Sequence, residues 1–187
     1  RDCGTTRTVL NSLFHRPISV GKRVRTDTRI AFKAVSVSYA AVELARKMFG
    51  ALVGSNVLVF GAGEMAELTV QHLVSKGIRK IYVANRSLPK ARALAEKFGG
   101  EAVPLAEAYQ KAVDVDVVVT STGAPHYVIR PWETQQLMTK RKGRPLVFVD
   151  IAVPRDVDPD VAGIKGVELY NIDDLEAVVG KNVRERQ

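Results

Sequence analysis

A glycine turn between a short apolar run and an amphipathic segment is the feature that most constrains how this 187-residue chain can fold. The run NVLVF, residues 56–60, is rich in valine, as a strand buried on both faces of a parallel sheet is. The turn FGAGEMA begins at its last residue and opens a segment, residues 64–77, with apolar side chains at helical spacing. A buried strand that leads through a tight turn into a helix predicts the first unit of a parallel α/β sheet.

The same alternation of strand and helix continues along the rest of the chain. Short apolar runs predict further strands at residues 80–84, 101–105, 115–122, 145–152 and 166–172. Helical spacing predicts helices at residues 88–99, 106–113, 131–138 and from 173 to the end. The predicted fold class is therefore α/β, a Rossmann-type doubly wound parallel sheet built by right-handed crossovers.

Helical segments are expected to flank this sheet at both ends of the chain. Residues 5–28 and 34–50 also show helical spacing and precede the first strand. Pro17 and Gly21 interrupt the first of these segments, and we expect them to kink or break it.

Composition narrows the class of protein. A hydrophobic fraction of 46% suffices for a core, and no run of about 18 apolar residues predicts a transmembrane helix. The N-terminal stretch RDCGTTRTV has neither an initiator methionine nor the apolar core of a signal peptide, which indicates a piece of a longer protein. The single cysteine, Cys3, excludes an internal disulfide and a cysteine-based metal cluster. We therefore predict a reducing, cytoplasmic setting and no metal site.

The net charge of +8 favours a polyanionic neighbour, although many proteins are as basic without one. Basic residues gather in two clusters, Lys22, Arg23, Arg25 and Arg29, and Lys140, Arg141, Lys142 and Arg144. Neither cluster is interleaved with aromatic residues, so no base-stacking surface is predicted. Trp132 and the tyrosines are interpreted as packing residues.

The glycine turn has the pattern of a dinucleotide-binding turn. Gly61 permits the tight turn, Gly63 lets the backbone approach a pyrophosphate, and Ala66 lets the helix pack close to the strand. Free N–H groups at the start of the helix then face the phosphates. The cofactor-binding residues predicted here are Gly61, Ala62, Gly63, Glu64, Met65 and Ala66. The alternative is a tight turn with no ligand.

A cation stands after the second predicted strand, where proteins that bind NAD usually have an acid for the ribose hydroxyls. The residues there are Asn85, Arg86 and Ser87. A guanidinium pairs with the ribose phosphate that distinguishes NADP from NAD, whereas an acid repels it. We predict that these three residues bind NADP. In the alternative, Arg86 is a solvated loop residue and Ser87 caps the next helix.

The ends of the later strands complete the predicted site, because ligands bind beyond the carboxyl ends of parallel strands. Thr120, Ser121, Thr122 and Gly123 are expected to pass over the cofactor towards its nicotinamide half. Residues 150–154, with Val153, are expected to line the nicotinamide pocket. The alternative for both stretches is ordinary turn chemistry.

No catalytic residue is predicted. His126 lies near the cofactor edge but has no evident partner in the sequence. Cys3 lies in a polar stretch without an activating neighbour.

Taken together, these motifs resemble the glutamyl-tRNA reductase family. The matching stretches follow the family order and are SVGKRVRTDT, AVSVSYAAVELA, VLVFGAGEMAELTVQHL, VANRS, TSTGAP, DIAVPRDVDP and YNIDDLEAVV. The glycine turn is common to many dehydrogenases, but SVGKRVRT and DIAVPRD are specific. Pro17, where the family has a continuous helix, and Tyr39, where it usually has a small residue, depart from the pattern.

The resemblance implies an NADP-dependent oxidoreductase that reduces glutamyl-tRNA to glutamate-1-semialdehyde in tetrapyrrole biosynthesis. Family members form a thioester on a cysteine of an N-terminal catalytic domain, and hydride from NADPH resolves it. Cys3 does not match that cysteine, so the fragment itself is expected to bind NADPH and to be inactive. The implied partners are glutamyl-tRNA, a second copy joined through a C-terminal dimerisation domain, and a downstream aminomutase, with no membrane.

The implied domains are the end of the catalytic domain at residues 1–33, the NADP-binding domain at 34–171 and the start of a linking helix at 172–187. Two other functions stay open on the sequence. The chain also fits an NADP-dependent oxidoreductase like shikimate dehydrogenase, which shares the glycine turn and the Asn-Arg-Ser motif. The second open function is that of a non-catalytic domain that senses NADP.

Overall fold

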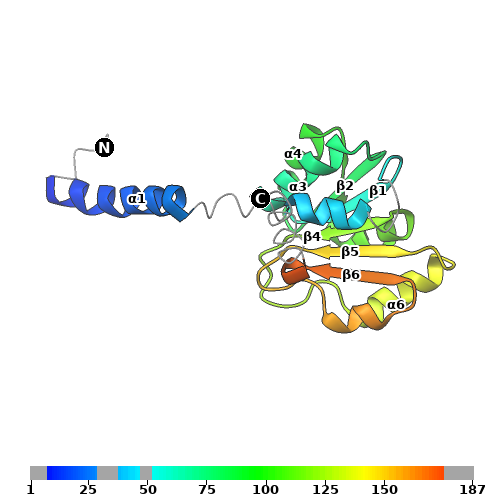
Figure 1. Cartoon of the computed structure of the whole chain (residues 1–187). Coiled ribbons are helices and arrows are strands. Elements are labelled where there is room, and N and C mark those ends of the chain that lie inside the picture. Colours follow the sequence, from blue (N-terminus) through cyan, green and yellow to red (C-terminus); the bar gives the residue numbers. More distant parts are fainter. Residues whose placement is uncertain (1–7, 29–37, 47–51, 175–187) are drawn as a thin grey trace, which may run out of the picture. The chain divides into compact units, whose positions relative to one another are not determined.

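The computed structural model describes residues 8–28, 38–46 and 52–174, and the chain divides into two compact units, residues 1–35 and 36–187 (Figure 1). The first unit contains helix α1, Thr8–Thr28. This helix runs without a break through Pro17 and Gly21. Proline removes one backbone hydrogen bond and glycine only adds flexibility, and the bonds on either side are enough to continue the helix.

The second unit is built on a six-stranded parallel sheet in the order β3-β2-β1-β4-β5-β6, which confirms the predicted doubly wound fold. The strands are β1 Asn56–Phe60, β2 Lys80–Asn85, β3 Glu101–Pro104, β4 Val117–Thr120, β5 Leu146–Asp150 and β6 Val167–Asn171. Every residue of β1, β4 and β5 is buried, as valine-rich runs without alternation predict.

Helices cover both faces of the sheet. One face packs against α3 Glu64–Ser75, α4 Leu88–Lys97 and the helical residues 38–46. The other packs against α5 Ala108–Lys111, α6 Pro131–Lys140 and the short 3₁₀ segments η2 Ala112–Asp114 and η3 Pro159–Gly163. The single helix predicted at 106–113 is divided into η1 Leu105–Glu107, α5 and η2. Residues 172–174 are helical, and the rest of the predicted C-terminal helix lies outside the described residues.

The register of the strands brings five strand ends to one edge of the sheet. Phe60 pairs with Ala84 and Thr120, Thr120 pairs with Asp150, and Asp150 pairs with Asn171. The loops that carry the predicted site residues therefore leave the sheet side by side. Within the described part of the chain, no helix is long and apolar enough to span a membrane.

Candidate functional site

The glycine turn and the loop after β4 meet where the strand order reverses. Gly61 has a φ of 110°, and a Cβ at this residue would lie 2.2 Å from the backbone oxygen of Ser121. The Ser121 amide also donates to the Phe60 oxygen at 2.8 Å. Because a side chain at residue 61 has neither a favourable φ nor space, glycine is required here.

Gly63 leaves the start of α3 open. It is the exposed N-cap of that helix, no side chain in the described part of the chain caps it, and a Cβ there would meet no described atom within 4 Å. The first N–H groups of a helix have no intrahelical acceptor, so this end of α3 attracts an anion. Ala66 in the same turn is fully buried against the sheet, whereas Glu64 is exposed.

Asn85, Arg86 and Ser87 lie beside this turn, because the Gly61 amide donates to the Ala84 oxygen at 2.8 Å. The Asn85 side-chain amide donates to the Ser87 oxygen at 3.2 Å and so shapes the loop. Arg86 is exposed and has no hydrogen bond or ion pair with any described residue. Ser87 is the N-cap of α4, but its hydroxyl makes no capping bond.

The far side of the edge is organised by the buried carboxylate of Asp150, which is 1% exposed. One oxygen accepts from the Thr120 hydroxyl at 2.9 Å and the Ala152 amide at 3.1 Å. The other accepts from the amides of Asp156 and Val157, both at 3.0 Å. The side chains of Thr120 and Asp150 therefore bond to each other below the surface and are buried.

A second buried carboxylate, Asp156, holds Thr122 in the same way. It accepts from the Thr122 amide at 2.7 Å and from the Thr122 hydroxyl at 2.5 Å. Burial raises the pKa of Asp156, and the Thr122 hydrogen bonds oppose that rise. The sequence offers a signal for this arrangement in the two aspartates of DIAVPRD, but their inward orientation depends on tertiary contacts.

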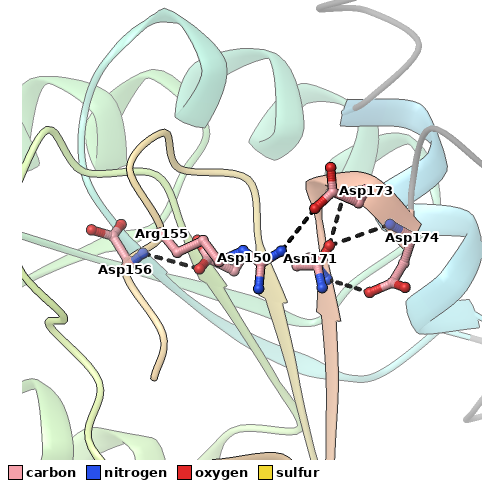
Figure 2. Close-up of polar contacts among 6 residues, drawn as sticks. All are labelled: Asp150, Arg155, Asp156, Asn171, Asp173 and Asp174. Atoms are coloured by element: carbon pink, nitrogen blue, oxygen red, sulfur yellow. Dashed lines mark hydrogen bonds and ion pairs between the residues drawn. The ribbon is translucent and has the colours of Figure 1, made fainter. Parts of the chain in front are cut away.

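Figure 2 shows polar contacts of the loop after β5 and of the residues at and beyond the end of β6. Val153, which is 75% exposed, lies in this loop. Arg155 then forms an ion pair with Asp173 at 2.8 Å. The Asn171 side chain accepts from the amides of Asp173 and Asp174, while Asp174 accepts from the Asn171 amide at 2.9 Å. This reciprocal cap starts the helix after β6.

One member of the second basic cluster is structural. Arg141 is 2% exposed, and its guanidinium donates to the backbone oxygens of Ala112, Val113, Val115, Arg144 and Pro145. Burial lowers the pKa of Arg141 to about 10. The cluster therefore offers less surface charge than the sequence suggests. In the first cluster Arg23 pairs with Asp27 at 3.3 Å, and Arg29 lies outside the described residues.

The interpretation of Trp132 as a packing residue is wrong. This side chain is 69% exposed, in the first turn of α6. It borders an open pocket of about 570 Å³ beside Tyr127, which is itself 39% exposed. The helical spacing around residue 132 gave no sign of this, because a single aromatic residue at a helix start fits either environment.

The strand order, the glycine turn at the switch point and the open start of α3 together define a dinucleotide-binding domain of the doubly wound class. Comparison with known families agrees. The family model described as "Shikimate / quinate 5-dehydrogenase" matches residues 43–178, and the chain belongs to that family.

The individual proteins that are about half identical to this chain over nearly its whole length are glutamyl-tRNA reductases and not shikimate dehydrogenases. The chain is 50% identical over its full length to a glutamyl-tRNA reductase from Maridesulfovibrio salexigens and 52% identical over 96% of its length to one from Desulfotalea psychrophila. It covers 42% of each of these relatives. Glutamyl-tRNA reductase from Methanopyrus kandleri has a similar structure, with a TM-score of 0.77 and 43% identity over 98% of this chain and 46% of that one.

These matches confirm the resemblance read from the sequence: the chain is homologous over its whole length to part of glutamyl-tRNA reductases. They also explain why the motifs of the nucleotide domain did not distinguish a glutamyl-tRNA reductase from an oxidoreductase like shikimate dehydrogenase. The dehydrogenase model begins at residue 43, whereas the reductases match the preceding residues as well.

Proposed function

We propose that this chain is the NADPH-binding part of a glutamyl-tRNA reductase. The observation that carries the choice of cofactor is the position of Arg86, an exposed arginine at the end of β2 without a partner among the described residues. A planar guanidinium at this place suits the ribose phosphate of NADP and gives NAD no equivalent contact.

The residues around the edge have distinct roles in this proposal. The N–H groups at the start of α3 hold the pyrophosphate, and Gly63 keeps the approach to them open. Asn85, Arg86 and Ser87 hold the adenosine ribose and its phosphate. The backbone of Thr120–Gly123 and the loop with Val153 border the nicotinamide half. When bound, NADPH supplies a hydride from its nicotinamide ring.

The fit of these residues to the cofactor is supported by two features of the structure. At the start of α3 and at Arg86, where phosphates are expected, the edge offers donors that no residue in the described ranges accepts. On the nicotinamide side the polar side chains of Thr120, Thr122, Asp150 and Asp156 bond to one another or to backbone amides. They therefore make a fixed wall, and no described residue there is assigned the role of acid, base or nucleophile.

In the longer protein, the substrate is glutamyl-tRNA, the product is glutamate-1-semialdehyde for tetrapyrrole synthesis, and a cysteine outside this chain forms the thioester. Residues 1–33 then belong to the catalytic domain, 34–171 bind NADPH, and 172–187 begin the linking helix. The exposed apolar side chains of α1, among them Leu13, Phe14 and Ile18, suit packing against such a catalytic domain. A cytoplasmic homodimer that passes its product to an aminomutase completes the proposal.

Calorimetric titration of this chain with NADPH and, separately, NADH tests the proposal. We expect NADPH to bind more tightly by about 1–3 kcal/mol, the value of a charge-assisted pair. Arg86→Ala removes that preference and leaves NADH binding nearly unchanged. Arg92→Ala, which removes another exposed arginine from the same βα unit, serves as the control and keeps the preference. Equal weakening of both cofactors by Arg86→Ala would contradict the assignment.

A further inference from the structure

The pocket at the start of α6 lies beyond the edge that the cofactor occupies in the proposed function. The loop that leaves β4 passes Gly123 and then forms one wall of the pocket. The pocket measures about 570 Å³, and its polar and aromatic lining consists of His126, Tyr127, Arg130, Trp132, Glu133 and Asp158.

Two aromatic rings stand at this pocket with much of their surface in water. Trp132, the only tryptophan of the chain, is 69% exposed, and Tyr127 is 39% exposed. Aromatic side chains gain most of their stabilising effect from burial, so an exposed tryptophan beside a pocket suits a ligand with a flat face. Every nucleobase has a flat π-face and can stack on such a ring, whichever base it is.

Glu133 adds a hydrogen-bonding requirement. Its Oε2 atom is buried and has no hydrogen-bond partner in the described part of the chain. The neighbouring Tyr109 hydroxyl does not supply one, because it donates to the Val128 oxygen at 3.1 Å. A buried acceptor without a donor is costly, and Glu133 also lines the pocket, so its carboxylate favours a ligand that brings an N–H group to it.

The charges of the pocket indicate what kind of ligand fits. Among the described residues that line the pocket, the guanidinium of Arg130 accompanies the two carboxylates of Glu133 and Asp158. A phosphate group would meet more negative than positive charge there. A neutral ring with an exocyclic amine, as in adenine or cytosine, suits both the aromatic wall and the carboxylate of Glu133.

We propose that this pocket binds an unpaired adenine base at the 3′ end of a tRNA. The proposal rests on the proposed function, which makes an aminoacylated tRNA the substrate. The terminal adenosine is unpaired, so both its ring face and its amine are accessible. It also bears the aminoacyl ester, and the pocket adjoins the loop that borders the nicotinamide half.

The structure fixes the pocket relative to that loop through Asp156. The carboxylate of Asp156 holds Thr122, while its backbone oxygen accepts from the amides of Val128 and Ile129 at 2.6 and 3.0 Å. Ile129 also forms a parallel bridge with Val157. The residues at the proposed cofactor edge and those at the pocket wall are therefore held by one buried side chain and its neighbours.

Fluorescence of Trp132 gives a direct test in this chain, since no other tryptophan contributes. The probe is the RNA 5′-ACCA-3′, and the control is the same RNA with purine riboside, which has no exocyclic amine, at the 3′ end. We expect ACCA to quench the emission and to bind roughly ten- to hundredfold more tightly than the control, the effect of one hydrogen bond to a carboxylate. No quenching by ACCA up to about 1 mM overturns the proposal.

Variants separate stacking from hydrogen bonding, with binding measured by anisotropy of a 5′-labelled RNA. Trp132→Ala weakens ACCA about tenfold, while Trp132→Phe, which keeps a ring, retains most of the affinity. Glu133→Leu, which removes the acceptor, abolishes the difference between ACCA and its control. Equal binding by Trp132→Ala and the parent chain would overturn the proposal. NADPH titration of each variant reports folding and the cofactor site independently, so a failure here is distinguishable from a failure of the proposed function.

Discussion

The two halves of the sheet edge differ in how their polar groups are used. On the side of β1 and β2, the start of α3 and Arg86 present donors that no described residue accepts. On the side of β4 and β5, Asp150 and Asp156 accept hydrogen bonds from the loops around them. The first half therefore keeps its binding capacity for a ligand, whereas the second uses its polar groups to fix the shape of the edge.

This contrast separates changes that affect binding from changes that affect folding. Substitutions on the β4–β5 side should lower the stability of the domain, and substitutions on the β1–β2 side should leave it stable with a weaker cofactor site. Gly61 is the exception, because it lies in the open half and yet touches the loop after β4.

The largest effect is expected for Gly61→Ala. The new Cβ meets the Ser121 oxygen, and the residue must also keep a φ of 110°, so we expect a loss of more than about 4 kcal/mol in the free energy of unfolding. Gly63→Ala is the matched control, since its Cβ enters open space, and it should change stability by less than about 1 kcal/mol while it weakens NADPH binding. Urea unfolding measures both. Similar stability of the two variants would contradict the close approach at the switch point.

The next largest effect is expected for Asp150→Asn. An amide keeps only one oxygen acceptor and turns an NH₂ group towards backbone donors, so we expect a loss of about 2–4 kcal/mol in the free energy of unfolding. Asp158→Asn is the control for charge, because that half-buried side chain accepts one backbone amide, at 3.0 Å, and should lose far less. If Asp150→Asn unfolds at the same urea concentration as the parent chain, the four hydrogen bonds contribute nothing to the free energy of unfolding.

A smaller effect is expected in the pH dependence of stability through Asp156. Burial raises its folded pKa above the ordinary value of an aspartate, so the folded state binds more protons than the unfolded state between these two pKa values. The contribution of this residue to stability is therefore greatest at low pH and falls as pH rises through the folded pKa. The difference in unfolding free energy between the parent chain and Asp156→Asn should fall over the same interval and then stay constant. A difference that rises with pH would show that the hydrogen bonds from Thr122 outweigh burial.

The smallest effect is expected for Asp173→Asn. The Arg155–Asp173 ion pair joins the fixed half of the edge to the helix after β6, but the two side chains are 41% and 75% exposed. Water and salt screen such a pair, so we expect a change of at most about 1 kcal/mol in unfolding free energy, and less at high salt. A loss as large as that for Asp150→Asn would place this ion pair among the structural contacts.

Local sequence patterns were enough to predict the parallel sheet and the first βα unit of this protein. Valine-rich runs predicted the buried strands, and the glycine turn predicted the first βα unit, because backbone conformation and burial on both faces restrict which residues can stand there. The place of Arg86 beside the turn follows from the same alternation, since consecutive parallel strands end at one edge. The resemblance of the sequence motifs to glutamyl-tRNA reductases then predicted the family of the relatives that were found.

Only the tertiary structure decided which polar and aromatic side chains face water. Arg141 stands in a run of basic residues but turns inward to backbone oxygens from residues 112–115, which are distant in the sequence. Trp132 stands in an amphipathic helix but remains exposed. Asp150 was expected to line the nicotinamide pocket, but its side chain and that of Asp156 are buried and support the edge. In each case burial depends on contacts between segments far apart in the chain, and no local pattern of residue types contains that information.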